Sequence, residues 1–157
     1  MKVQLVVIGK TTQDFVERGL SEFIARIKHY LPFEMTVIPD LKNTKNLSFE
    51  QIKEKEGELL LKTIIPGDFV VLLDENGKTF SSLQFAAYLE KKLHTTSKNL
   101  LFVIGGAYGF SQKVYAAAQE KISLSSMTFS HQLIRLVFVE QLYRSMTILN
   151  HEPYHHE

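Results

Sequence analysis

Short apolar runs alternate with segments of helical periodicity along this chain, and this alternation limits the available folds more than any other feature. Val3–Ile8, Phe69–Leu73 and Asn99–Ile104 are almost continuously apolar, which is typical of strands buried on both faces of a parallel sheet. Phe33–Ile38 alternates in polarity instead and predicts a strand near the sheet edge. Lys121–Leu124 predicts a fifth, short strand.

Helices are expected between these strands. Apolar residues recur at helical spacing from Phe15 to His29, and Ser48 and Ser81 each stand three residues before a glutamine, as in a capping box. Alternating strands and helices imply an α/β fold with a mostly parallel sheet sandwiched by helices. Without a linker or repeat, residues 1–157 are expected to form a single domain. The predicted helices are Phe15–His29, Ser48–Thr63, Ser81–Leu93, Ser111–Ala118 and His131–Leu149.

Composition excludes several classes of protein. The chain has 157 residues, of which 45% are hydrophobic and 22% charged, and no cysteine, so it is neither a disulfide scaffold nor a cysteine-based metal protein or enzyme. It has no run long enough for a membrane span or a signal peptide, and we expect a cytoplasmic protein. A net charge of +1 means that any contact with RNA depends on local basic groups. Candidates are Lys10, Arg18, Arg26, Lys28, Lys42 and Lys45.

Three loops follow the carboxyl ends of predicted strands, where parallel α/β sheets bind ligands. They are Leu73–Lys78, Ile104–Gly109 and Leu124–Ser130, and all three are expected at one edge of the sheet. Each has a simpler structural interpretation. Asn76-Gly77 favours a tight turn, the glycine loop fits a strand-to-helix connection, and the last loop fits a helix cap.

The last predicted helix and the tail after it carry further candidates. Arg135 lies between apolar residues, where a guanidinium needs a partner such as a phosphate, a carboxylate or a second subunit. Glu140 and Arg144 share a helix face and predict an ion pair. The tail is either frayed or ordered so that Tyr154 and His155 meet a substrate base. No second histidine cluster supports a metal site, and none is expected.

Taken together, these motifs resemble the ribosomal RNA large subunit methyltransferase H family of the SPOUT class. The similarity spans the whole chain, and the combination of C-terminal motifs is specific although each alone is not. His156 is a departure, because relatives often have a basic residue there. The matching segments are Leu73 with the acidic residue after it, Ile104-Gly105-Gly106 with Gly109, Leu124–Arg135, Glu140–Arg144 and Tyr154-His155.

The resemblance implies a SPOUT-type α/β knot with a C-terminal trefoil knot, and a homodimer with the knotted regions in its interface. It also implies that S-adenosyl-L-methionine binds in the knot. Tyr108 and the helix after it are expected to be scaffold. The implied cofactor-binding residues are Leu73, Gly105, Leu124, Ser125, Ser126, Met127, Thr128 and Phe129.

The implied substrate is a pseudouridine in 23S ribosomal RNA, methylated at N3 on the assembled ribosome. His155 is the candidate base, because imidazole titrates near neutral pH, with Arg144 and Tyr154 beside it as catalytic candidates. Arg135, Arg144 and His131 are the candidate RNA contacts. Two alternatives stay open: a non-catalytic nucleotide-binding module associated with the ribosome, and a hydrolase that uses Asp74 or His131.

Overall fold

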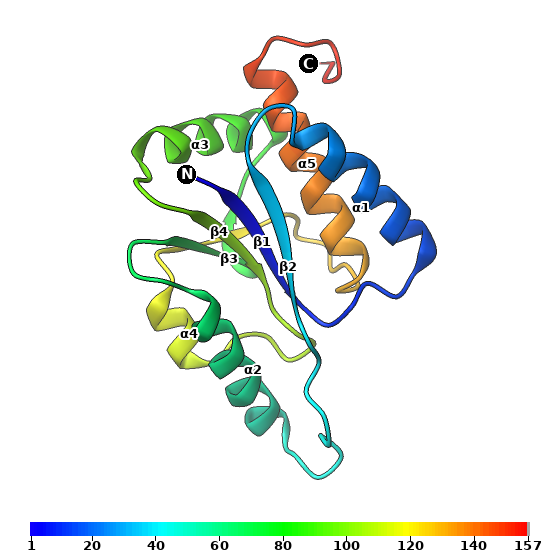
Figure 1. The fold of residues 1–157 in the computed structure, drawn as a ribbon, viewed down its shortest axis with the longest axis vertical. Coiled ribbons are helices and arrows are strands. Elements are labelled where there is room, and N and C mark those ends of the chain that lie inside the picture. The colour runs from blue at the N-terminus through cyan, green and yellow to red at the C-terminus, as the bar shows by residue number, and fades with distance from the viewer. Residues whose placement is uncertain (157) are drawn as a thin grey trace.

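A parallel sheet of five strands forms the centre of the protein (Figure 1), in the order β2-β1-β4-β3-β5. The computed structural model describes residues 1–156. The predicted α/β class is confirmed, and β2 lies at the sheet edge as its alternating pattern predicts. The strands are β1 (Val3–Ile8), β2 (Phe33–Ile38), β3 (Phe69–Thr79), β4 (Leu100–Ile104) and β5 (Glu120–Ser123).

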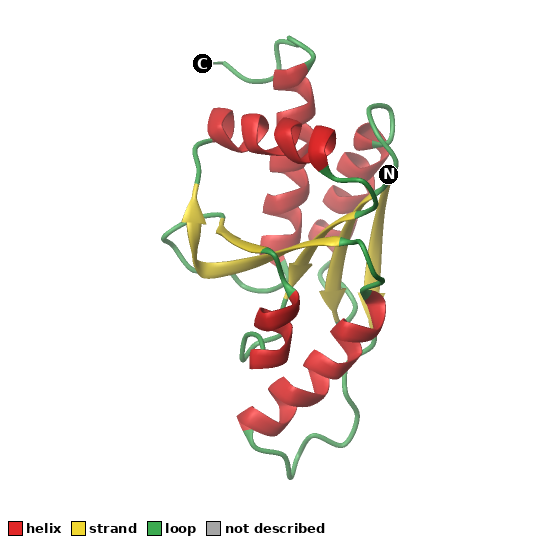
Figure 2. Ribbon diagram, turned by 90° about the vertical axis from the view of Figure 1, so that its left-hand side faces the viewer, coloured by secondary structure: helices red, strands yellow, loops and turns green. Residues whose placement is uncertain are grey.

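Helices cover both faces of this sheet (Figure 2), and within residues 1–156 three lie on one side and two on the other. The first group packs around Phe102 of β4, whose ring centroid lies 4.8 Å from the ring centroid of Phe138. The second group packs on the opposite face, against Leu101 and Val103 of the same strand. The first group comprises α1 (Asp14–Ile27), α3 (Ser82–Thr95) and α5 (Leu133–Leu149), and the second comprises α2 (Phe49–Thr63) and α4 (Gln112–Ala117).

Helix starts follow the predicted caps. Ser48 and Ser81 both form complete capping boxes with the glutamine three residues later, and the Ser111 hydroxyl caps α4. Helix α5 begins at Leu133, two residues later than expected. The side chain of Gln132, just before the helix, binds the loop after β1: it accepts from the Thr12 amide at 2.8 Å and donates to the Lys10 carbonyl at 3.1 Å.

Strand β3 is longer than expected, and the predicted turn at Asn76-Gly77 was wrong. The strand continues to Thr79 and pairs with β5 through a bulge between Leu73 and Lys78. The backbone of Gly77 approaches Ile122 so closely that a Cβ there would lie 2.5 Å from its carbonyl carbon. The Asp74 carboxylate accepts from the Asn76 amide at 2.9 Å within the bulge. The bulge therefore displays the acidic residues at the strand-end edge without a hairpin.

Among residues 1–156, no helix is both long enough and apolar enough to cross a membrane.

Candidate functional site

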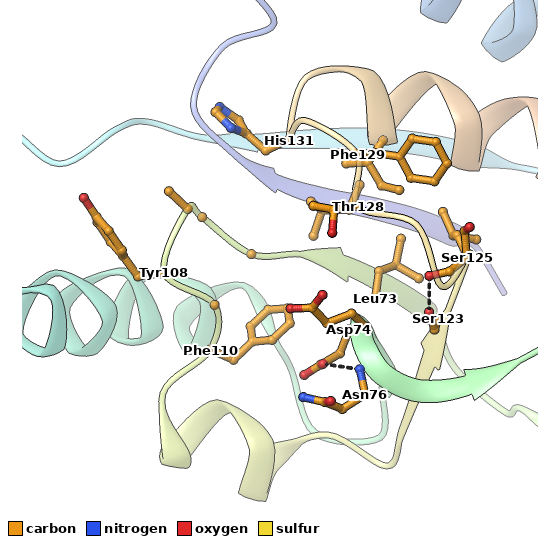
Figure 3. A pocket seen from close by; sticks show the side chains of 18 of the residues that line it. Leu73, Asp74, Asn76, Tyr108, Phe110, Ser123, Ser125, Thr128, Phe129 and His131 are labelled. Carbon is orange, nitrogen blue, oxygen red and sulfur yellow. Dashed lines mark hydrogen bonds between the residues drawn. The ribbon is translucent and has the colours of Figure 1, made fainter.

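The three strand-end loops meet around one pocket of about 530 Å³ (Figure 3). The first comes from the bulge of β3, the second from the glycine loop after β4, and the third from the segment between β5 and α5. The prediction that they lie at one edge of the sheet is confirmed. The volume lies in the range of small-molecule sites.

Most of the residues proposed for the cofactor line this pocket. Ser126 lies in the same loop but is not among the lining residues, whereas His131 is among them and is exposed. Tyr108 also lines the pocket, which corrects its assignment to the scaffold alone. The lining candidates are Leu73, Gly105, Leu124, Ser125, Met127, Thr128 and Phe129.

The loop between β5 and α5 is shaped by its own serines. The Ser123 hydroxyl donates to the Ser125 carbonyl at 2.9 Å, and the Ser125 hydroxyl accepts from the Met127 amide at 2.9 Å. The Ser130 hydroxyl accepts from the Leu133 amide at 3.1 Å, so this loop satisfies a donor at the helix start, as the predicted cap requires. Met127 is 77% exposed at the mouth of the pocket. A loop fixed in this way offers a preformed wall to a ligand.

A buried carboxylate of α2 lies close to the backbone of the glycine loop. Glu56 of α2 is 9% exposed, and a Cβ on Gly106 would lie 2.5 Å from its Oε1. Burial, and then the charge of Asp40, raise the pKa of the Glu56 carboxyl. A larger residue at position 106 would therefore require the Glu56 side chain to shift.

Sequence reasoning missed the groups that hold the acidic side of the pocket. The Tyr115 hydroxyl of α4 donates a short hydrogen bond to the Asp74 carboxylate. Burial, and then this hydrogen bond, raise the pKa of Tyr115 to about 12, so the phenol stays protonated and orients Asp74. Lys53, Phe110 and Gln112 also line the pocket without having been predicted. No local motif marks them, because they come from α2, the loop before α4 and α4 itself.

Arg135 does not lie at a surface that RNA could reach, which corrects its assignment to the substrate. It is 1% exposed, and burial lowers the pKa of its guanidinium. The guanidinium donates to the Ile8 carbonyl at 2.7 Å and to the Gly9 carbonyl at 2.8 Å. It also reaches the Thr11 hydroxyl and the His131 carbonyl. The end of β1 and the loop after it therefore provide hydrogen-bond acceptors that the buried Arg135 requires.

Replacing Arg135 with lysine is expected to lower the free energy of unfolding by about 2 kcal/mol. An ammonium group cannot reach all four acceptors of the guanidinium at once, so buried carbonyls lose their donors. Denaturant titration of the Arg135→Lys protein measures this loss, with Arg18→Lys on the exposed side of α1 as the control. Equal stability of the two variants would contradict the structural role of Arg135.

The catalytic candidates gather at the other end of α5. The Glu140 carboxylate accepts from Arg144 at 2.6 Å and from the Tyr154 hydroxyl at 3.0 Å. Arg144 also lies over the Tyr154 ring and donates to Nδ1 of His155 at 3.0 Å. Burial and the Glu140 acceptor raise the pKa of the Tyr154 hydroxyl. The tail is therefore ordered, and the predicted Glu140–Arg144 ion pair is confirmed.

Within one chain, this cluster and the pocket are separate. His131 and Ile134 line the pocket at the start of α5, whereas Arg144 lies ten residues beyond Ile134, about 15 Å along a helix. Figure 1 shows the tail after α5 at the top of the molecule, above the sheet, whereas β4 runs down to the loop before α4 in the lower half. In residues 1–156, no three histidine or acidic side chains come together in a way that could hold a metal ion.

Comparison with known proteins gives one consistent result. Residues 1–155 match the family model described as "Predicted SPOUT methyltransferase". Two proteins called "Ribosomal RNA large subunit methyltransferase H" are 65% identical (Parabacteroides distasonis) and 62% identical (Phocaeicola vulgatus), each over 157 residues and 100% of both chains. A probable methyltransferase from Bordetella pertussis Tohama I has the same fold, with a TM-score of 0.56 at 9% identity, and the match covers 92% of this chain and 93% of that one.

Proposed function

The chain belongs to the SPOUT methyltransferase family, and from this premise we propose that it methylates N3 of a pseudouridine in 23S ribosomal RNA with S-adenosylmethionine. The observation that carries the proposal is the pocket: three loops far apart in the sequence meet at the positions that the family resemblance assigns to the cofactor. The relatives at 65% and 62% identity are named as methyltransferases of the large-subunit RNA. We place the reaction on the assembled ribosome, in the cytoplasm.

The pocket suits a nucleoside cofactor with a positive charge. Its walls combine apolar side chains, such as Leu73 and Leu124, with the backbone of two loops, which can recognise the edge of a purine. Asp74 and Glu75 place negative charge on one side, where a sulfonium and an amine are favoured. When bound, S-adenosylmethionine supplies an activated methyl group, so the residues of the chain need mainly to position the acceptor base.

The acceptor side of the site is incomplete in a single chain, and we propose that a homodimer completes it. An ordered cluster is formed by Arg144, Tyr154 and His155, and none of these residues lines the pocket of the same chain. A twofold dimer in which α5 of one copy meets the pocket of the other would bring the cluster to the cofactor. The C-terminal trefoil knot, with the knotted region in this interface, is part of the same proposal.

The geometry of the tail defines the chemistry proposed for it. A guanidinium only donates, so Nδ1 of His155 is the acceptor in its contact with Arg144, and a neutral ring carries its proton on Nε2. His155 can take the N3 proton at Nδ1 if the substrate base displaces Arg144 from that atom. Arg144, still held by Glu140, is then placed to stabilise negative charge on a uracil oxygen.

Replacing His155 with alanine is expected to reduce methyl transfer by about a hundredfold or more while leaving cofactor affinity unchanged, because a general base contributes only to the chemical step. Single-turnover methylation of ribosomes measures the first quantity, and calorimetry with S-adenosylhomocysteine the second. His156→Ala, at an exposed position in the same tail, is the matched control. Unchanged turnover of the His155→Ala protein would remove His155 as the base.

The proposed function is tested by methylation of ribosomes beside calorimetry with S-adenosylmethionine. We expect tight cofactor binding together with transfer of the methyl group to 23S RNA. Cofactor binding without transfer to any ribosomal particle would instead support a nucleotide-binding module without catalysis.

A further inference from the structure

Two exposed aromatic rings are stacked at the rim of the pocket. Phe49 begins α2 and Tyr108 lies in the glycine loop, and their ring centroids are 4.2 Å apart with the planes inclined by 17°. Phe49 is 64% exposed and Tyr108 42%. Every other ring pair among residues 1–156 is tilted or edge-on. The two rings are therefore stacked at the surface beside the pocket and are not part of the buried core.

The surroundings of the stack are charged and polar. Glu50 and Gln51 are exposed on the same turn of α2 as Phe49. Lys53 follows Phe49 by four residues, so it shares that helix face, and it lines the pocket. Obligate subunit interfaces are broader and more apolar than two rings within a charged turn. Flat rings beside a cation instead match a nucleotide, which has a flat base and an anionic phosphate.

We propose that the Phe49–Tyr108 stack is a platform for an unpaired base of the substrate RNA next to the target nucleotide, with Lys53 directed at its phosphate. The proposal rests on the proposed function. An enzyme that modifies a base must take it out of the helical stack, and the neighbouring bases lose a stacking partner. Aromatic side chains that stack on splayed bases replace that contact in RNA-binding proteins.

The position of Tyr108 connects the platform to the reaction. Tyr108 belongs to the loop whose first glycines line the pocket, so a base stacked on its ring lies beside the mouth through which the target base enters. Among residues 1–156, Lys53 is held only by Glu50, at 2.8 Å, and the Glu50 side chain is 76% exposed. Such surface pairs are weak, so Lys53 can turn from Glu50 to a phosphate at little cost.

The test compares variants of the full-length protein in ribosome methylation. Phe49→Ala and Tyr108→Ala should each raise the KM for ribosomes about tenfold, since base–aromatic stacking contributes affinity of this size. The dissociation constant of the Phe49→Ala protein for S-adenosylhomocysteine should stay at the parent value, because Phe49 does not line the pocket, and the oligomeric mass of both variants should be unchanged. Tyr108→Phe preserves the ring and should retain most of the affinity. Ile65→Ala, 52% exposed beyond the other end of α2, is the control for loss of an exposed apolar side chain.

Each outcome decides the proposal. A KM for ribosomes within twofold of the Ile65→Ala control would overturn it while leaving the methyltransferase activity in place. Weakened binding of S-adenosylhomocysteine by the Phe49→Ala protein would assign the stack to the cofactor, and a loss of oligomeric mass would assign it to an interface between copies of the chain; either result overturns it too. If the parent protein binds ribosomes but never methylates them, the proposed function fails, and the platform as a substrate contact fails with it.

Discussion

Mixing a pocket variant with a tail variant is expected to restore methyl transfer that neither variant retains alone. Thr128→Trp places a large ring in the pocket from an exposed position, so cofactor binding is lost with little effect on the fold. Arg144→Ala removes a hydrogen-bond partner from both Glu140 and His155. Each variant alone should lose at least about a hundredfold in turnover, because catalytic groups and substrate positioning each contribute that much.

Recovery follows from the symmetry of a dimer that shares its sites. With random assembly, half of the dimers are mixed, and each mixed dimer has one site with an intact pocket and an intact tail, so about a quarter of the parent turnover should return. The matched control mixes Arg144→Ala with His155→Ala, since every site then has a damaged tail. Recovery no greater than in this control, in samples shown to contain mixed dimers, would mean that the tail does not serve the partner's pocket.

Replacing Gly77 with alanine is expected to lower the free energy of unfolding by about 2 kcal/mol or more and to weaken cofactor binding. The added Cβ would lie within 2.6 Å of three backbone atoms of Ile122, and backbone cannot move aside as a side chain can. Relief requires β3 and β5 to separate. Because Leu73 and Leu124 line the pocket beside these two strands, their separation also changes the site.

Denaturant titration and calorimetry with S-adenosylhomocysteine measure the two effects. For the stability measurement, Gly109→Ala is the control, since Gly109 has a positive φ of 83° but no atom within 4 Å of an added Cβ. The strain of an alanine in a left-handed backbone conformation costs about 1–2 kcal/mol and leaves the pairing of β3 with β5 intact. A Gly77→Ala protein as stable as the parent would show that this close approach does not hold the two strands.

Features that depend on nearby residues were predictable from the sequence. The apolar runs of β1 and β4 and the capping boxes at Ser48 and Ser81 act within a few residues, and the structure has them where the pattern places them. The pocket was also predictable, because parallel strands deliver their following loops to one edge. That rule, together with the alternation of strands with helices, was enough to predict where the glycine loop and the loop after β5 lie.

Features that depend on distant partners were not predictable from the pattern. From its apolar neighbours, Arg135 was expected to bind an anion. Two of its hydrogen-bond acceptors are instead carbonyl groups 126 and 127 residues earlier in the chain. The turn expected at Asn76-Gly77 is a bulge, because Gly77 approaches Ile122 of another strand. The stack of Phe49 on Tyr108 joins two elements that share no sequence motif.

Mass-spectrometric mapping of 23S ribosomal RNA, from cells with and without this gene, tests the central claim most directly. We expect one pseudouridine to lose a single methyl group in the deletion strain. Purified protein and S-adenosylmethionine should restore that methyl group when added to ribosomes from the deletion strain. Identical methylation of every 23S nucleotide in the two strains would contradict the assignment of this chain as a 23S RNA methyltransferase.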